Sequence, residues 1–243
     1  MTVSTVAEKK MEERIEKRKL EVQKIALDLE AAKSVVEKDK RKFFAKLGFL
    51  KPSQEEIECE SAQLFYEPFT VAKANYYLDY YKKKTYSIKV DDEVSEVIIF
   101  GQTLKPELVR GLLRRPHKTL AFDVQERVIH RVVNQVALNR RGHEVDPTKL
   151  PSGPIEPDSK KALEKAGEKV RKLTLSPETI LDLIRKRTAQ RPPDVGKIAK
   201  EVFEITEHTV ILTPIYEARC RQVKTGEIRI IPISGITGKM LSL

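Results

Sequence analysis

The first 50 residues constrain the fold most, because they carry a long heptad pattern. From Val6 to about Leu47 the chain contains neither Gly nor Pro, and apolar residues recur mostly at steps of three, four or seven. A helix over this stretch would be about 60 Å long at 1.5 Å per residue, so its narrow apolar stripe needs a partner along its length. We therefore predict a coiled-coil helix over residues 1–50. Its seam consists of Met11, Ile15, Val22, Ile25, Leu29, Ala32, Val36 and Phe43.

The predicted partner of this seam is a second copy of the chain, which gives a homodimer. β-Branched residues at the a positions, such as Ile15, Val22 and Val36, favour two-stranded coils, whereas Arg18 and Asp39 at d positions weaken the seam. The pattern leaves open whether the two helices run parallel or antiparallel. A helical hairpin within one chain is the alternative way to bury the stripe.

Residues 51–146 form the first predicted α+β domain. Strand-like runs over Phe69–Tyr81 and Thr85–Val90, joined by a turn at Lys82-Lys83-Lys84, predict a hairpin. Beyond it, valine recurs every four residues, which favours a helix over about 123–139, although the valine content also suits a strand. These valines are Val124, Val128, Val132 and Val136.

Residues 147–158 contain several prolines and form the predicted linker to a second α+β domain at 159–243. The second domain begins with three helical patterns, of which the middle one has Ser176 as its cap and Pro177 in its first turn. It ends with strand patterns. The predicted helices are Ser159–Leu173, Ser176–Ala189 and Asp194–Thr206, and the predicted strands are Thr209–Leu212, Ile215–Gln222 and Glu227–Ile233.

The two predicted domains share a short similarity. Pro68–Lys73 resembles Pro214–Arg219, and each segment follows an apolar strand and precedes a lysine-bearing turn. We interpret this as a candidate internal repeat of a helix-plus-antiparallel-sheet unit. Chance similarity between two hairpins is the alternative.

The composition favours a nucleic-acid partner. The 243 residues carry a formal net charge of +10 and a sequence pI of about 9.4, and such a surplus attracts acidic molecules. Simple solubility is the alternative explanation. A charged fraction of 34% without Trp is common in proteins of heat-loving organisms. We find no signal peptide and no apolar run long enough to span a membrane, so we expect a cytoplasmic protein with no membrane partner.

The tyrosine-rich hairpin is the predicted RNA-binding surface. Alternation places Tyr76, Leu78 and Tyr80 on one face of the strand, and Tyr77 and Tyr81 on the other. One face must be core, while the other can stack on bases as nearby lysines meet phosphates. The alternative is that the exposed tyrosines only support a two-sided sheet. With the basic clusters along the chain, the predicted RNA-binding residues are Tyr77, Tyr81, Lys82, Lys83, Lys84, Arg110, Arg114, Arg115, Arg140, Arg141, Arg185, Lys186, Arg187 and Arg191.

The sequence does not assemble a catalytic or metal site. Cys59 and Cys220 fit no metal spacing and imply no disulfide framework, and the four histidines are scattered. A magnesium-dependent nuclease built on Glu217 and Asp194 is the weighed alternative, but Arg219 stands where such sites usually place lysine. We interpret Glu217 as the solvent face of an alternating strand. We expect a protein that is not an enzyme and that needs no cofactor or metal.

The heptads from Met11 to Phe43 and the basic α+β body together resemble, in gross architecture, the archaeal-type ribosome dimerisation or hibernation factors. Those proteins join or occlude ribosomal subunits. The resemblance implies a homodimer that binds ribosomal RNA, bridges two subunits and regulates translation. No motif supports it, so no functional residue is transferred. The alternatives are a dimer that binds DNA or chromatin, and a coiled-coil assembly adaptor for a protein machine.

Overall fold

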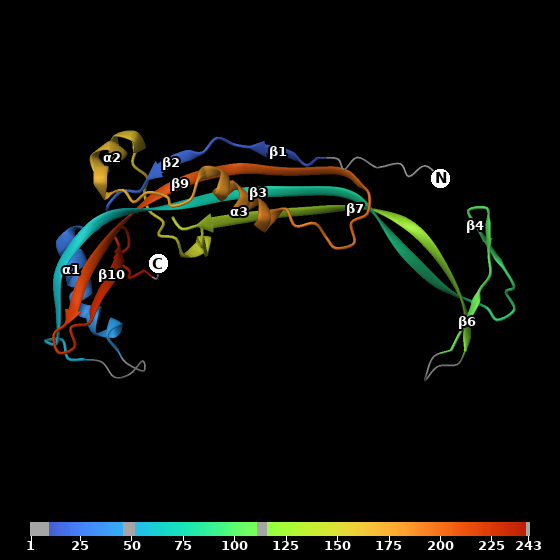
Figure 1. The fold of residues 1–243 in the computed structure, drawn as a ribbon, viewed down its shortest axis with the longest axis horizontal. Helices are drawn as coiled ribbons and strands as arrows, with labels where there is room; N and C mark the ends of the chain where they lie inside the picture. Colours follow the sequence, from blue (N-terminus) through green and yellow to red (C-terminus); the bar gives the residue numbers. More distant parts are fainter. Residues whose placement is uncertain (1–9, 46–51, 111–115, 242–243) are drawn as a thin grey trace. The chain divides into compact units, whose positions relative to one another are not determined.

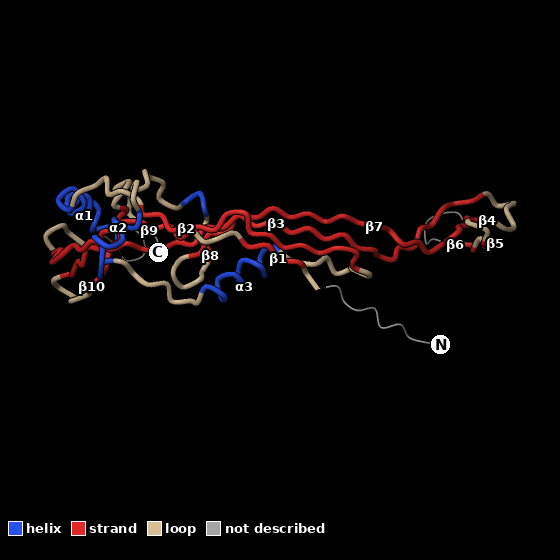
Figure 2. Tube along the Cα trace, turned by 90° about the horizontal axis from the view of Figure 1, so that it is seen from above, coloured by secondary structure: helices blue, strands red, loops and turns tan. Residues whose placement is uncertain are grey.

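Three long strands organise the molecule, and they are neighbours in one sheet (Figure 1). They are β3 (Ile57–Val90), β7 (His117–Leu138) and β9 (Ile198–Gln222). The computed structural model describes residues 10–45, 52–110 and 116–241. Figure 2 shows the helices as short stretches beside these much longer strands. The expectation of an α+β fold led by one long helix is therefore wrong, because the described residues are mostly β-strand.

The main sheet of the described residues has eight strands and contains the path β1-β9-β3-β7-β6. Off this path, β10 pairs antiparallel with β9, β2 pairs parallel with β9, and β8 pairs antiparallel with β7. Two further strands, β4 and β5, form a separate antiparallel pair. The shorter strands are β1 (Glu12–Ile15), β2 (Lys19–Val22), β4 (Val97–Ile99), β5 (Gln102–Leu104), β6 (Glu107–Val109), β8 (Glu144–Val145) and β10 (Ile228–Ser234).

The chain divides into two compact units, each made of segments that are distant in the sequence. Unit 1 comprises Met1–Arg14, Tyr76–Val132 and Ala189–Phe203, and unit 2 comprises Ile15–Asn75, Val133–Thr188 and Glu204–Leu243. The proline-rich segment predicted as a linker lies in unit 2, where Gln23 donates from its side-chain amide to the Pro151 carbonyl over 2.8 Å. Pro68 and Pro214, which mark the candidate repeat, lie within β3 and β9 of the same unit.

The predicted N-terminal coiled coil is wrong, since the stretch forms β1, β2 and then the helix α1 (Leu29–Phe43), only 15 residues long. Asp28 fixes the start of α1, because its carboxylate accepts from the Ala31 amide over 2.7 Å. The seam residues do not share one surface. Val22 is buried beside Val210 and Leu212 of β9, and α1 packs in another cluster.

The remaining seam residues confirm that no continuous stripe exists in the described part of this stretch. Met11 packs in unit 1, Ala32 and Val36 are buried in unit 2, and Phe43 is partly buried beside them. Ile15 and Ile25 are more than 40% exposed, and Leu29 is 38% exposed. The helix-end motif predicted around Gly48 lies outside the described residues. The apolar residues of this stretch thus serve separate intrachain cores instead of a partner helix.

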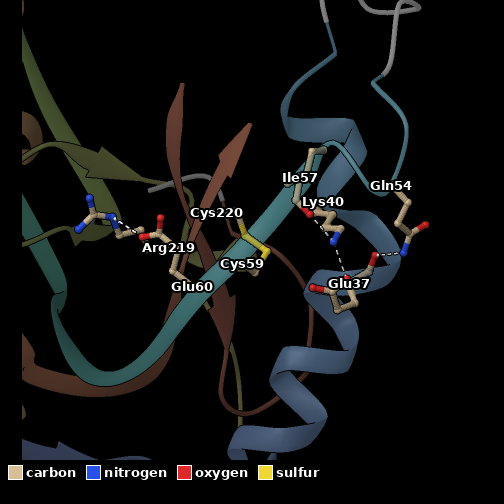
Figure 3. Close-up of a disulfide and its surroundings, with 8 residues drawn as sticks. All are labelled: Glu37, Lys40, Gln54, Ile57, Cys59, Glu60, Arg219 and Cys220. Atoms are coloured by element: carbon tan, nitrogen blue, oxygen red, sulfur yellow. Dashed lines mark hydrogen bonds and ion pairs between the residues drawn. A yellow bond between two sulfur atoms is a disulfide. The ribbon is translucent and has the colours of Figure 1, made fainter. Parts of the chain in front are cut away.

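The core of unit 2 lies between α1 and the strands β3, β9 and β10. Its fully buried members include Ile57, Ile231 and Ile233, with Phe44 directly after α1. Lys40 of α1 is 5% exposed and donates from Nζ to the Ile57 carbonyl over 2.6 Å (Figure 3). This buried cation ties the helix to the first residue of β3, and it also forms a 2.6 Å ion pair with Glu37 of the same helix.

A disulfide joins Cys59 of β3 to Cys220 of β9 next to this core, across 161 residues of sequence (Figure 3). The two cysteines, which were predicted to imply no disulfide framework, thus form a disulfide with each other. Their spacing in the sequence carries no signal, since only the pairing of β3 with β9 brings them together.

Several secondary-structure predictions also need correction. The turn at Lys82-Lys83-Lys84 does not exist, because β3 runs on to Val90, and the stretch offers no Gly, Pro, Asn or Asp to turn the chain. The valine-rich helix is the strand β7, which was the alternative interpretation. The helix predicted from Asp194 is instead the approach to β9 and its first residues.

Two predicted helix starts are confirmed. The helix α2 (Ser159–Ala166) begins after Asp158, whose carboxylate accepts from the Lys161 amide over 3.0 Å. It is shorter than predicted, since Gly167 takes a positive φ of 52° and the short 3-10 helix Gly167–Lys169 follows. The helix α3 (Pro177–Thr188) follows Ser176 as predicted. A second 3-10 helix covers Pro147–Lys149. No helix of the described residues is long and apolar enough to cross a membrane.

Candidate nucleic-acid interface

The strand β3 presents two chemically different faces in unit 1. Tyr76, Leu78 and Tyr80 are at most 3% exposed and form a hydrophobic cluster with residues of β7 and of the segment before β9. Tyr77 and Tyr81 alternate with them and are only partly buried. The structure therefore confirms the alternation predicted for this strand.

Arginines of β7 lie over the tyrosine rings of the second face. The guanidinium carbon of Arg131 is 5.5 Å from the ring centroid of Tyr77, and that of Arg127 is 6.0 Å from the centroid of Tyr81. Such distances allow cation–π contact. Because side chains alternate along both strands, Ile129 lies between the two arginines on the same face.

We call this surface the Tyr–Arg face. Its members from β3 are Tyr77, Asp79, Tyr81 and Lys83, and its members from β7 are Arg127, Ile129 and Arg131.

One of the two arginines is held by a carboxylate, and the other is not. Arg127 donates from Nε and Nη2 to Asp79 over 2.9 and 2.6 Å, and this ion pair lowers the pKa of Asp79. Asp79 is 6% exposed in its side chain, whereas Arg127 is 59% exposed. Arg131 makes no ion pair with any described carboxylate. The face therefore carries a positive surplus from Arg131 and the exposed Lys83.

This arrangement can bind a base and a phosphate side by side. A tyrosine ring and an arginine plane are both flat surfaces on which bases stack, and the guanidinium can also donate to a phosphate oxygen. Ile129 is 53% exposed and adds apolar area between the arginines. The face thus combines stacking surfaces with unneutralised charge, which is the chemistry that single strands require.

Other predicted RNA-binding residues of unit 1 are engaged in ion pairs. Lys82 is 2.9 Å from Asp194 and 3.8 Å from Glu126, and the hydrogen bond to Asp194 raises the pKa of Lys82. Arg191 donates to Glu201 over 2.8 and 2.6 Å. Burial alone would raise the pKa of Glu201, but the hydrogen bonds from Arg191 and Tyr76 outweigh it and lower that pKa. The pair of Lys82 with Asp194 holds the segment before β9 against β3, and the pair of Arg191 with Glu201 holds it against β9.

The remaining predicted residues do not join the Tyr–Arg face. Lys84 lies 5.4 Å from the ring centroid of Tyr86 on the opposite face, and Arg110 is exposed beyond β6. Arg114 and Arg115 lie outside the described residues. The others belong to unit 2, where most pair with carboxylates. Arg140 pairs with Glu67, Arg185 with Asp182 and Arg187 with Glu144. Lys186 and the exposed Arg141 also belong to unit 2.

Sequence reasoning missed Arg127 and Arg131, which complete the face. The signal was present, because Arg127, Ile129 and Arg131 alternate with Val128 and Val132. An interpretation of this stretch as a strand would have placed the arginines opposite the valines.

The two acidic residues of the nuclease alternative belong to different units, and each already pairs with a cation. Glu217 belongs to unit 2 and pairs with Arg171 over 2.6 Å, while Asp194 belongs to unit 1 and pairs with Lys82. The Glu217 side chain is 17% exposed, so its assignment to a solvent face is wrong. Among the described residues, no group of three or more His, Cys, Asp or Glu side chains is arranged to hold a metal ion.

Comparison with models of protein families, with curated proteins and with solved structures finds no match to this chain.

Proposed function

We propose that the chain binds single-stranded RNA, including unpaired segments of structured RNA, on the Tyr–Arg face. The observation that supports the proposal is the pairing of Tyr77 with Arg131 and of Tyr81 with Arg127 on one open side of β3 and β7. The opposite side of the same strand pair is the packed side, with Tyr76, Leu78 and Tyr80.

The spacing of the rings defines how a strand would lie. Tyr77 and Tyr81 are four residues apart on an extended strand, which separates them by about 13 Å. This is too far for both rings to sandwich one base, so each ring stacks on a different nucleotide. The backbone between those nucleotides then runs along β3 and β7, within reach of Arg131 and Lys83.

Ribosomal RNA stays the predicted source of such single strands, and co-sedimentation with ribosomal particles from a native lysate is its test. The bridging mechanism depended on the N-terminal coiled coil, and that helix does not exist in the fold. The proposal is therefore restricted to RNA binding by one chain.

Fluorescence anisotropy with a labelled 12-nucleotide single-stranded RNA tests the proposal. Removing a stacked ring costs about 1–3 kcal/mol, so Tyr77→Ala and Tyr81→Ala should each weaken binding by about 5- to 150-fold. Tyr77→Phe keeps the ring and should bind like the wild type. Tyr86→Ala is the matched control, since Tyr86 is an exposed tyrosine of β3 on the other face. Thermal unfolding of each variant checks that the fold is kept.

Two adjacent lysines allow an equally sharp test of the charge. The slope of log affinity against log salt is about −0.7 per phosphate contact in single strands, so Lys83→Gln should make it shallower by about that amount. Lys84→Gln removes the same charge from the opposite face and should leave the slope nearly unchanged. Equal effects of both lysine variants, or no binding by the wild type, would contradict the proposal. Tighter binding of duplex DNA at matched salt would favour the DNA-binding alternative.

A further inference from the structure

Unit 2 contains a cavity of about 310 Å³ that opens beside the turn between β7 and β8. Ligand sites in proteins usually measure about 300–1,000 Å³, so this cavity can hold a small molecule. Its polar wall carries more cations than anions. The lining residues are Glu67, Asn139, Arg140, Arg141, His143, Val145, Arg171, Glu217, Ile230 and Pro232.

Part of the cavity wall is a network of ion pairs. Glu67 is 7% exposed in its side chain and lies 3.1 Å from Arg140 Nε and 3.2 Å from Arg171 Nη1. Arg171 also donates from Nη2 to Glu217 over 2.6 Å, and its guanidinium carbon lies 4.5 Å from the ring centroid of Phe65. Two glutamates therefore hold two arginines in place at the same spot.

The turn between β7 and β8, which forms another part of the wall, is equally well defined. The Asn139 side-chain carbonyl accepts from the amides of Arg141 and His143 over 3.0 and 3.1 Å, and Gly142 takes a φ of 79°. Thr174 donates from both its amide and its hydroxyl to the Arg140 carbonyl. The backbone that carries Arg140 and Arg141 is thus tied down on both sides.

Several donors at this site have no partner among the described residues. Arg140 approaches Glu67 through Nε, and its two Nη groups make no hydrogen bond with a described residue. The guanidinium of Arg141 and the ring of His143 make no hydrogen bond or ion pair with a described residue. Three arginines face two glutamates, which leaves a surplus of one positive charge before His143 is counted.

We infer that this cavity binds the phosphate of a nucleoside monophosphate, either free or at the 5′ end of an RNA. Arginines recognise phosphate well because their planar donors can bind two oxygens at once. Val145, Pro232 and Ile230, which is 60% exposed, supply an apolar wall for the base or ribose. The site uses no residue of the Tyr–Arg face, so the inference goes beyond the proposed function and does not depend on it.

Calorimetric titration of the full chain with AMP tests the inference, with adenosine as the probe that lacks the phosphate. Arg141→Gln should weaken AMP binding by about tenfold or more, because a hydrogen-bonded charge is lost. Arg221→Gln is the matched control. Arg221 is an exposed arginine of β9 in the same unit, outside the cavity, with no described ion pair. Neither arginine holds a described carboxylate, so we expect both variants to unfold at the wild-type temperature.

AMP binding by the wild type and by Arg221→Gln, with adenosine silent, is the expected result. Absence of AMP binding, or equal weakening by both arginine variants, would overturn the inference. Competition with a trinucleotide that carries either a 5′-phosphate or a 5′-hydroxyl separates the two sources. Displacement of AMP by the phosphorylated form alone identifies an RNA end, and displacement by neither form identifies a free nucleotide. Tyr77→Ala should bind AMP like the wild type, which separates this result from the outcome for the Tyr–Arg face.

Discussion

Reduction of the disulfide between Cys59 and Cys220 should destabilise unit 2 strongly. The bond closes a loop of 161 residues between β3 and β9. In the chain-entropy description, a loop of this length restricts the unfolded chain by about 17 cal/mol/K, which corresponds to about 5 kcal/mol at 25 °C. Folded domains are typically stable by about 5–15 kcal/mol, so the loss would be a large part of the total.

Urea unfolding with and without a reducing agent measures this loss directly. Reduction of the wild type removes no heavy atom from the core, whereas Cys59→Ala with Cys220→Ala also removes two sulfur atoms. The reduced wild type therefore isolates the effect of the crosslink, and the double variant adds the cost of a cavity beside Ile231. Thiol titration under denaturing conditions confirms which form is present.

The location of the effect gives a second criterion. Hydrogen exchange should quicken first where Cys220 pairs with Arg229 and where Lys40 meets Ile57, because these contacts adjoin the disulfide. An equal midpoint for the oxidised and reduced chains, with both thiols proven free in the latter, would refute the reasoning. The same holds if the oxidised protein already shows two titratable thiols.

Three further predictions concern stability. Burial, reinforced by Arg18, lowers the pKa of His208 in the folded chain. Because the unfolded chain then binds a proton more readily, the free energy of unfolding should fall as the pH drops below about 6.5. The difference between the urea midpoints at pH 7.5 and pH 5 should be smaller in His208→Leu than in the wild type. Lys40→Met removes the donor to the Ile57 carbonyl and also breaks the 2.6 Å ion pair with Glu37, and it should cost about 1–3 kcal/mol in urea unfolding. Gly142→Ala should lower the melting temperature more than Gly226→Ala; both glycines have positive φ, at 79° and 71°, but only at Gly142 would a Cβ meet leucine side chains.

The valine-rich stretch shows why the fold could be predicted only in part. A spacing of four residues is one helical turn and also two strand periods, so Val124, Val128, Val132 and Val136 share a face in either structure. Their β-branched side chains favoured the strand, and the partners that decided the outcome lie in β3, outside any local window. By contrast, the starts of α2 and α3 were predictable, because the capping residues Asp158 and Ser176 act on amides three residues away.

The coiled coil predicted for the N-terminal stretch was wrong for a related reason. A heptad pattern records that apolar residues recur at certain steps, but it does not record what buries them. Val22 and Val36 satisfy the same pattern and are buried in different clusters: Val22 packs with Val210 and Leu212, whereas Val36 lies on α1 in the cluster that contains Ile231 and Ile233. The candidate site was predicted to the extent that it rests on alternation within one strand. Tyr77 and Tyr81 were placed correctly on β3, whereas Arg127 and Arg131 were missed because their own strand was interpreted as a helix.

The distribution of ion pairs decides which cations can meet an anionic partner. A net charge of +10 describes the whole chain, but a carboxylate offsets the charge of the lysine or arginine that it pairs with, and a donor atom engaged in such a pair must be released before it can bind a phosphate. Lys82, Arg140 and Arg191 are basic residues that the sequence alone ranks with Lys83 and Arg141, yet each holds a carboxylate. Lys83, Arg131 and Arg141 hold none among the described residues. Lys83 and Arg131 lie on the Tyr–Arg face, and Arg141 lines the cavity beside the turn between β7 and β8. Binding at either site therefore uses charge that folding leaves unpaired, and it does not require the ion pairs of β3 and β7 to break.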